Sequence, residues 1–248
     1  MIQWTRTKKY TVAQHFATRY YGAQMAQFDP SSSRNPPGNS EDQTLDYYSL
    51  NASLSAEQAG AVFERDALQE FSKSLKAGSR ILDAGCGGGL HLRYFLEQGF
   101  ECEGFDGSAE VLKVAEENLR PWLAPPSKLK LWKADFRLLS LAREHYDAIW
   151  ANRVLIHLPP PGCQRTMQTF FSALKPGGLL FVSFEAELTE ETFTTVAERP
   201  ELTGPARHIY RYPPMEFESL VRQSGFQPLA TGQDLQHPER MGILAKRV

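Results

Sequence analysis

Three glycines at alternate positions follow the first strand expected in this chain, and they can bring the backbone close to a ligand. Asp83 precedes them, and Gly85, Gly87 and Gly89 lead into a helical stretch. A dinucleotide-binding loop needs the pattern GxGxxG or GxGxxA, but the sixth position counted from Gly85 is Leu90. The spacing therefore disfavours NAD and FAD, and the lysine motif of phosphate-binding P-loops is absent as well.

Two carboxylates follow the next two expected strands. Asp106 lies 21 residues after Gly85 and is followed by Ser108, while Asp135 is followed by Phe136. A carboxylate at the first position can accept hydrogen bonds from both hydroxyls of a ribose. The plainer alternatives are an acid that precedes a helix with Ser108 as its N-cap, and a surface acid beside a core phenylalanine.

The string ILDAGCGGG at residues 81–89 resembles the first motif of class I S-adenosylmethionine-dependent methyltransferases. Later segments match that family's motifs in order, and they are GFDGS (104–108), KADF (133–136), YDAIWA (146–151) and LKPGG (174–178). With the closing strands, the resemblance extends over some 170 residues. It implies an α/β fold with a Rossmann-like, seven-stranded and mostly parallel sheet, and S-adenosylmethionine as the cofactor.

The resemblance also implies which residues bind the cofactor. Asp106 would hold the ribose, Asp135 and Phe136 the adenine, and Asp83 would orient the glycine loop. Cys86 is expected to pack under the cofactor and not to act as a nucleophile, because no basic neighbour in sequence activates its thiol. The full set of expected cofactor-binding residues is Asp83, Gly85, Cys86, Gly87, Gly89, Asp106, Ser108, Asp135, Phe136 and Asn152.

Attack on a sulfonium methyl group asks little of the protein, because the methyl group is already electrophilic. Alignment alone is worth about 7–11 kcal/mol, and a general base for an oxygen or nitrogen nucleophile adds about 10²–10⁴-fold. His157 follows the fourth expected strand and is the candidate base; the alternative is a histidine that anchors its loop to the backbone. The other histidines lack metal-ligand spacing, so no metal is expected.

Tyr47 and Tyr48 complete the expected catalytic set as a lid over the site. Aromatic faces attract a sulfonium or ammonium group by about 0.5–2 kcal/mol, and Tyr20 and Tyr21 are further candidates for the same role. The alternative is that these tyrosines pack an N-terminal helix onto the domain.

Two charged stretches near the end of the chain have more than one possible role. Glu185 and Glu187 are candidates to pair with an ammonium group, or else belong to an exposed acidic face. Residues 207–212, RHIYRY, offer arginines that suit a carboxylate of the substrate or of the cofactor. A surface turn is the alternative for that stretch.

Methyl transfer to a small molecule by in-line displacement is the leading reaction. The alternative enzyme attacks the γ-carbon of the same cofactor, either closing a small ring or transferring the aminocarboxypropyl group, and releases methylthioadenosine. A cofactor-binding protein without turnover is a third possibility. The departure of residues 152–155 from the (N/D)PP(Y/F) motif argues against methylation of a nucleobase amine.

The elements that must position these residues are short apolar runs that alternate with helical stretches, which is typical of βαβ units. Residues 1–78 are expected to form an N-terminal helical lid with a flexible loop at 29–40, and residues 79–248 the cofactor-binding α/β domain. A helix is expected from near Ser55 to a stop at Gly78. The expected strands are Arg80–Ala84, Glu101–Phe105, Lys128–Lys133, Asp147–Ala151, Leu179–Phe184, Gln227–Ala230 and Met241–Lys246. The expected helices are Leu90–Gln98, Ala109–Leu119 and Cys163–Leu174.

Composition sets the remaining limits. The chain has 248 residues, 42% of them hydrophobic, and a formal net charge of −2, which argues against a nucleic-acid partner. Three scattered cysteines without CxxC fit a reducing compartment. No apolar run is long enough to span a membrane. We therefore expect a cytoplasmic protein that acts on a small molecule.

Overall fold

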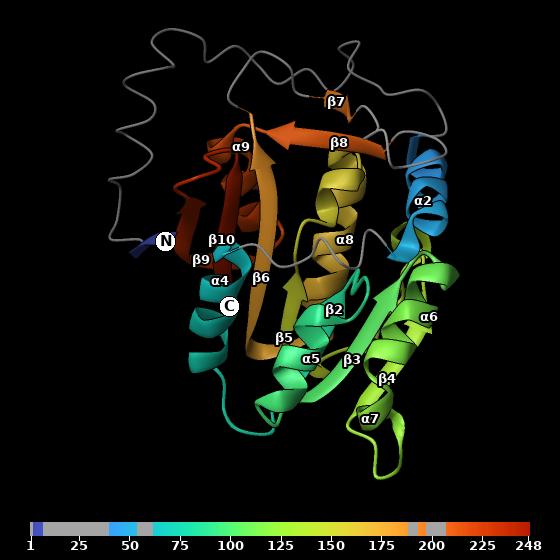
Figure 1. Cartoon of the computed structure of the whole chain (residues 1–248). Helices are drawn as coiled ribbons and strands as arrows, with labels where there is room; N and C mark the ends of the chain where they lie inside the picture. The colour runs from blue at the N-terminus through green and yellow to red at the C-terminus, as the bar shows by residue number, and fades with distance from the viewer. Residues whose placement is uncertain (1, 7–39, 54–61, 188–192, 197–206) are drawn as a thin grey trace, which may run out of the picture.

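A mixed sheet with a parallel centre forms the middle of the molecule (Figure 1). The computed structural model describes residues 2–6, 40–53, 62–187, 193–196 and 207–248. The strands are β1 (Ile2–Arg6), β2 (Arg80–Ala84), β3 (Glu101–Asp106), β4 (Leu129–Lys133), β5 (Tyr146–Ala151), β6 (Leu174–Ala186), β7 (Phe193–Val196), β8 (Arg207–Tyr212), β9 (Phe226–Asp234) and β10 (Arg240–Arg247).

The strand order is β1-β9-β10-β6-β5-β2-β3-β4, with β8 paired to β6 and β7 to β8 off this path. Strands β6, β5, β2, β3 and β4 run parallel, whereas β10, β9 and β1 pair antiparallel. The chain builds the sheet outward from β2 through β3 and β4, and then returns to the other side of β2 with β5. Ligands bind at such a switch point, outside the carboxyl ends of the strands.

The predicted α/β class and Rossmann-like arrangement are confirmed, and all seven predicted strands are present. The sheet is larger than predicted, because β1 adds an eighth strand to the path at its edge and β8 pairs with β6 beside it. The LKPGG segment, predicted as a turn before a strand, is the irregular beginning of β6. Its pairing with β5 jumps from Leu174 to Leu179 there, and Gly177 has φ 78°.

Helices cover both faces of the sheet, which explains why β2 and β5 are buried along almost their whole length. Neighbouring residues of β2 point to opposite faces, so that Ile81 and Leu82 belong to different core clusters. The helices are α2 (Ser40–Leu50), α4 (Val62–Lys73), α5 (Leu90–Glu97), α6 (Ala109–Asn118), α7 (Arg120–Leu123), α8 (Pro160–Ala173) and α9 (Pro214–Gln223), with 3₁₀ turns η1 (Phe136–Leu138) and η2 (Leu155–His157).

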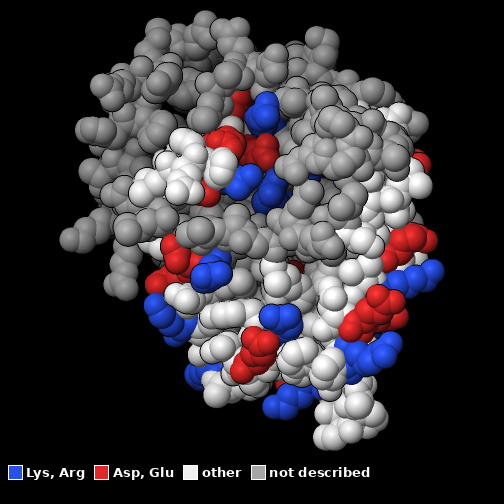
Figure 2. Space-filling view, in the orientation of Figure 1, with Lys and Arg blue, Asp and Glu red and all other residues white. Residues whose placement is uncertain are grey.

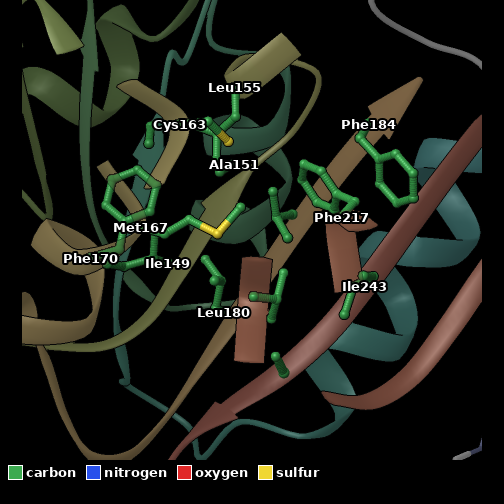
Figure 3. Close-up of a cluster of buried hydrophobic side chains, with 14 of the residues drawn as sticks. Ile149, Ala151, Leu155, Cys163, Met167, Phe170, Leu180, Phe184, Phe217 and Ile243 are labelled. Atoms are coloured by element: carbon green, nitrogen blue, oxygen red, sulfur yellow. The ribbon is translucent and has the colours of Figure 1, made fainter. Parts of the chain in front are cut away.

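One face is covered by α4, α5 and α6, and its centre is aromatic. Phe71 of α4 and Phe95 of α5 pack against Trp150 of β5, which stacks on Phe181 with ring centroids 3.9 Å apart. The other face is covered by α8 and α9. Figure 3 shows Met167 and Phe170 over one part of the sheet and Phe217 beside Phe184 over another.

The N-terminal segment contributes more than a lid. β1 pairs with β9, and α4 buries Phe71 in the core, so both belong to the sheet and its cover. α2 was not predicted as a helix, and it lies beside β8 at the carboxyl edge of the sheet (Figure 1). Tyr20, Tyr21, the loop at 29–40 and the predicted helix start at Ser55 lie outside the described residues. Among the described helices, none combines the length and apolarity needed to cross a membrane.

Candidate active site

A cavity of about 450 Å³ lies at the carboxyl ends of β2, β3 and β5. The glycine loop after β2 forms its floor, and the segment after β5 forms one wall. Side chains of α2, including Glu41, Thr44 and Tyr48, form another wall. The cavity therefore lies where the strand order places a ligand site.

Hydrogen bonds from its own backbone shape the glycine loop. The amides of Gly85 and Cys86 both donate to the Phe105 carbonyl at 2.9 Å. Gly85 has φ 72°, and Gly87 has φ 54° and lines the cavity. The amide of Gly87 donates to Oδ2 of Asp106 at 3.1 Å. Adjacent strands thus hold the loop, and its backbone faces the cavity.

Alanine substitutions at two of these glycines should have different effects. A Cβ on Gly85 would lie 2.5 Å from Cγ2 of Val154, at a φ that already disfavours alanine, so Gly85→Ala should lower the melting temperature strongly. A Cβ on Gly87 meets no atom within 4 Å and would point into open space. Gly87→Ala should therefore cost less stability and mainly weaken binding of S-adenosylhomocysteine. Thermal unfolding and calorimetric titration measure the two effects, and equal melting temperatures would contradict this difference.

Asp106 ends β3 and lines the cavity. Oδ2 accepts the Gly87 amide and Oδ1 accepts the Ser108 amide at 3.0 Å. Burial raises the pKa of Asp106, and these amide hydrogen bonds act in the opposite direction. Each oxygen retains a lone pair, so the carboxylate can still accept hydrogen bonds from a ligand's hydroxyls.

Asp83 lies beneath the loop at the end of β2 and is almost fully buried, with 1% exposure. Its Oδ2 has no hydrogen-bond partner among the described residues. Burial raises the pKa of Asp83 to about 7, the positive potential of His91 opposes this, and Asp106 adds to it. A cationic ligand group near the glycine loop would relieve this buried carboxylate.

Asp83 should give the ligand-free protein a distinctive pH dependence. A carboxyl group with a pKa near 4 when unfolded and about 7 when folded favours the folded state below pH 4, and this contribution is lost as the pH rises through 7. We compare the free energy of unfolding of Asp83→Asn with that of the unsubstituted protein. This difference should rise in favour of Asp83→Asn by roughly 2–4 kcal/mol as the pH goes from about 4 to 8. Denaturant unfolding at both pH values measures this shift.

Asp147→Asn is the matched control for that measurement. Burial alone would raise the pKa of Asp147, but hydrogen bonds from Lys175 and from the Arg80 amide lower it. Its stabilising contribution is therefore present at neutral pH and is lost as the pH falls. Between about pH 4 and pH 8, the stability difference between Asp147→Asn and the unsubstituted protein should therefore stay nearly constant, because the pKa of Asp147 in the folded state lies below the ordinary value. An Asp147→Asn gain as large as that of Asp83→Asn would refute the assignment for Asp83.

Asp135 and Phe136 stand at the cavity wall after β4. The Asp135 carboxylate forms a two-pronged ion pair with Arg137, with a shortest distance of 2.6 Å, and Arg137 also contacts Asp42 of α2 at 2.8 Å. Although burial acts to raise it, the Arg137 hydrogen bonds lower the pKa of Asp135. The Phe136 ring packs on Phe105, with centroids 4.9 Å apart. Asp135 therefore ties the wall to α2 as well as facing the cavity.

His157 is held with one ring nitrogen fixed and the other toward Tyr48 of α2. Its Nδ1 lies 2.7 Å from the His208 carbonyl, which only accepts hydrogen bonds, so Nδ1 carries the proton. In the neutral ring Nε2 is then an acceptor, and the Tyr48 hydroxyl donates to it at 3.0 Å. Burial lowers the pKa of His157 to about 3, and Arg207 and Arg153 lower it further while the His208 carbonyl opposes them. The imidazole is therefore neutral, and its Nε2 is a hydrogen-bond acceptor at the cavity wall.

Asn152 and Arg153 form a fixed corner after β5. The Ser183 hydroxyl donates to Oδ1 of Asn152 and accepts from the Arg153 amide, both at 2.7 Å. Arg153 has φ 55°, a left-handed conformation that is unusual for arginine. Its side chain reaches Glu185 at 3.4 Å. Glu185 is buried and also lies 3.7 Å from Arg211, so the exposed acidic face considered for it is wrong.

α2 is fastened to β8 across the cavity. Thr44 accepts the His208 amide at 3.0 Å, and Gln43 lies 2.6 Å from Nε2 of His208. Tyr47 is buried and packs edge-on against Tyr48, with centroids 5.3 Å apart. Both tyrosines line the cavity, as does Arg207 at the start of β8.

Most of the predicted site residues meet at this cavity. The residues that line it are Tyr47, Tyr48, Gly85, Cys86, Gly87, Asp106, Asp135, Phe136, Asn152 and His157. Asp83 and Gly89 lie behind the loop, and Ser108 caps α6 by accepting the Val111 amide at 3.2 Å. Burial raises the pKa of Cys86, so its thiol stays protonated.

Sequence reasoning missed the arginines of the cavity. Arg137, Arg153 and Arg240 line it, and none was singled out. No local signal marks them, because they come from separate segments that only the fold brings together. Arg207 was noticed, but only as part of a charged stretch that was equally consistent with a surface turn.

The fold and the site together define a class I S-adenosylmethionine-dependent methyltransferase. A model of the methyltransferase domain matches residues 55–231. Among solved structures, the 1,6-didemethyltoxoflavin-N1-methyltransferase of Burkholderia thailandensis superposes with a TM-score of 0.68, at 17% identity over 90% of this chain and 98% of that one. The [4+2]-cyclase SpnF gives a TM-score of 0.66 at 18% identity, over 85% of this chain and 97% of its own.

Two curated relatives bear the same name. The ubiquinone biosynthesis O-methyltransferase of Nitrosospira multiformis is 33% identical over 108 residues, 43% of this chain and 43% of the relative. That of Xanthomonas axonopodis pv. citri is 30% identical over 164 residues, 61% of this chain and 64% of the relative. The chain thus spans less than two thirds of either relative. It belongs to the methyltransferase-domain family, whose cofactor is S-adenosylmethionine.

The residues present fit that cofactor. A side chain at Gly87 would fill open space in the cavity, as expected where a ligand approaches the backbone. The orphaned Oδ2 of Asp83 lies behind the same loop. The glycine loop, Asp106 and Phe136 supply hydrogen-bond donors, a carboxylate that suits the hydroxyls of a ribose, and an aromatic face.

Proposed function

We propose that this protein transfers the methyl group of S-adenosylmethionine to a hydroxyl group of a small molecule, with His157 as the proton acceptor. The observation that carries the proposal is the placement of Nε2 of His157. This unprotonated acceptor stands in the same cavity as the glycine loop. A cavity of about 450 Å³ suits a small-molecule ligand.

The cofactor supplies an electrophilic methyl group, and the protein binds and orients it. Gly85, Gly87 and Asp106 would hold the nucleoside, with Phe136 against the adenine. Asp83 supplies negative charge beneath the loop for the amino-acid end. α2 and the segment after β5 flank the cavity and would reduce the access of water to the reacting groups.

His157 takes the proton from the acceptor. Its Nδ1–H bond to the His208 carbonyl fixes the tautomer and stabilises the ring as it gains charge. A pKa of about 3 makes it a weak base, which favours an acidic hydroxyl such as a phenol over an aliphatic alcohol. The guanidinium of Arg207, bonded to the Tyr48 hydroxyl at 3.3 Å, adds positive charge that favours a phenolate.

The curated relatives support this assignment. Both are named O-methyltransferases, and their name points to an acceptor oxygen. The Tyr48 hydroxyl, itself a phenol, already donates to Nε2 of His157 and so occupies the position proposed for the acceptor hydroxyl.

The by-product tests the proposal. The protein is incubated with S-adenosylmethionine and a set of phenols and catechols, and the products are analysed by mass spectrometry. Methyl transfer leaves S-adenosylhomocysteine together with a methyl ether. Methylthioadenosine would instead indicate attack at the γ-carbon, and it would overturn the proposal.

A further inference from the structure

Four arginines line the cavity, and two of them have no carboxylate partner in the described part of the chain. Arg137, Arg153, Arg207 and Arg240 all line the cavity, and Asp42 and Asp135 neutralise the first of them. Within the described part of the chain, no carboxylate comes within 4.0 Å of Arg207 or Arg240, and Glu41 of α2 pairs with none of the four. In the upper part of Figure 2, basic and acidic side chains lie side by side, so pairing between them, and not the number of arginines alone, decides which arginines remain for a ligand.

Arg207 is held in place but is only partly satisfied. Its Nη1 donates to the Tyr48 hydroxyl at 3.3 Å, and its guanidinium lies 5.9 Å from the centre of the Tyr47 ring. Its Nε is buried and finds no hydrogen-bond partner among the described residues. Arg207 therefore keeps positive charge and hydrogen-bond donors beyond the one that Tyr48 uses.

Arg153 is also held by the protein through only part of its guanidinium group. Its Nη2 reaches Glu185, which it shares with Arg211, and its buried Nε also lacks a partner in the part of the chain that the structure describes. One carboxylate therefore serves two guanidinium groups, and charge remains for an anion. A planar carboxylate matches the paired donors along an arginine edge.

We infer that Arg207 and Arg153 form a carboxylate-binding subsite, and that the acceptor is a hydroxy acid whose hydroxyl group meets His157. The inference rests on the proposed function and names its substrate class. Arg207 and His157 both bond to the Tyr48 hydroxyl, at 3.3 Å and 3.0 Å, so the two groups reach the same oxygen atom. The carboxylate and the reacting hydroxyl of the acceptor are therefore close to each other in one small molecule.

Matched acids and amides test the subsite by calorimetric titration of the full chain saturated with S-adenosylhomocysteine. The pairs are 2-hydroxybenzoate with its amide and 2,3-dihydroxybenzoate with its amide, in which a phenolic hydroxyl is next to the carboxylate. The acid should bind at least about tenfold more tightly in one pair, as expected for charge-assisted hydrogen bonds. Arg207→Gln should abolish this preference, and Arg222→Gln, an exposed arginine of α9 paired with Glu218, should keep it.

Two results would overturn the inference. One is an amide that binds as tightly as its acid in both pairs, and the other is a preference that survives Arg207→Gln. A second titration asks whether Arg207 binds the carboxylate of the cofactor instead of that of the acceptor. Methylthioadenosine lacks the amino-acid tail of S-adenosylhomocysteine. If Arg207→Gln weakens the binding of S-adenosylhomocysteine but not that of methylthioadenosine, Arg207 holds the cofactor, and its assignment to the acceptor fails.

Failure of the proposed function has a different signature. It appears as absent binding of S-adenosylhomocysteine or absent formation of that by-product. The comparison of acid with amide is also measured in cofactor-free protein, so it decides the subsite in either case.

Discussion

His157→Asn should lower kcat by about 10²–10⁴-fold and leave the affinity for S-adenosylhomocysteine unchanged. The asparagine amide can still donate to the His208 carbonyl, as Nδ1 of His157 does at 2.7 Å. It offers no basic nitrogen in place of Nε2, so the acceptor keeps its proton. Steady-state kinetics with the acceptor found in the by-product assay, together with calorimetry, measures both quantities.

Tyr48→Phe provides the control for that experiment. It removes the hydroxyl that donates to Nε2 at 3.0 Å but keeps the aromatic wall and the base. Its effect on kcat should be smaller than that of His157→Asn. Activity that persists in His157→Asn would show that the histidine only anchors its loop. Because burial lowers the pKa of His157 to about 3, kcat/KM should also show no acid limb near pH 6.5 from this residue.

Asp106→Ala should weaken binding of S-adenosylhomocysteine by at least about tenfold, because a charged acceptor of ligand hydrogen bonds is lost. The loop loses support as well, since Asp106 accepts the amides of Gly87 and Ser108. Methylthioadenosine keeps the ribose, so its binding should weaken by a similar factor. Calorimetric titration with both ligands measures this.

Glu110→Gln is a suitable control for Asp106→Ala. Glu110 lies on the first turn of α6 close to Asp106, and it accepts a hydrogen bond from Ser108 at 3.3 Å without lining the cavity. Its substitution should leave both affinities unchanged. An unaltered dissociation constant in Asp106→Ala would refute the assignment of Asp106 to the ribose.

The fold could be predicted from local patterns because its central strands are apolar runs separated by turn residues. Arg80–Ala84 was predicted with the bounds that β2 has, and the other predicted strands differ from theirs mainly at the ends. β1 and α2 were missed for physical reasons. β1 gains its stability from pairing with β9, more than 220 residues later in the chain, and α2 has no clear apolar stripe.

The meeting of the proposed cofactor-binding residues at one cavity could also be predicted, since they follow consecutive strands whose carboxyl ends meet at one edge. The residues on the proposed acceptor side could not be predicted. The left-handed backbone of Arg153 depends on Ser183, and the approach of Arg207 to Tyr48 joins segments 159 residues apart. Neither contact has a local signature. The role proposed for His157 depends on the His208 carbonyl, which the sequence does not bring near it.

The long separation between α2 and β8 has a consequence for synthesis on the ribosome. Thr44 meets His208 across 164 residues, whereas Gly87 meets Asp106 across 19. Local contacts form before distant ones because they close shorter loops. A nascent chain can therefore shape the nucleoside half of its pocket early, and it acquires the acceptor half only when the segment containing Arg207 and His208 has emerged.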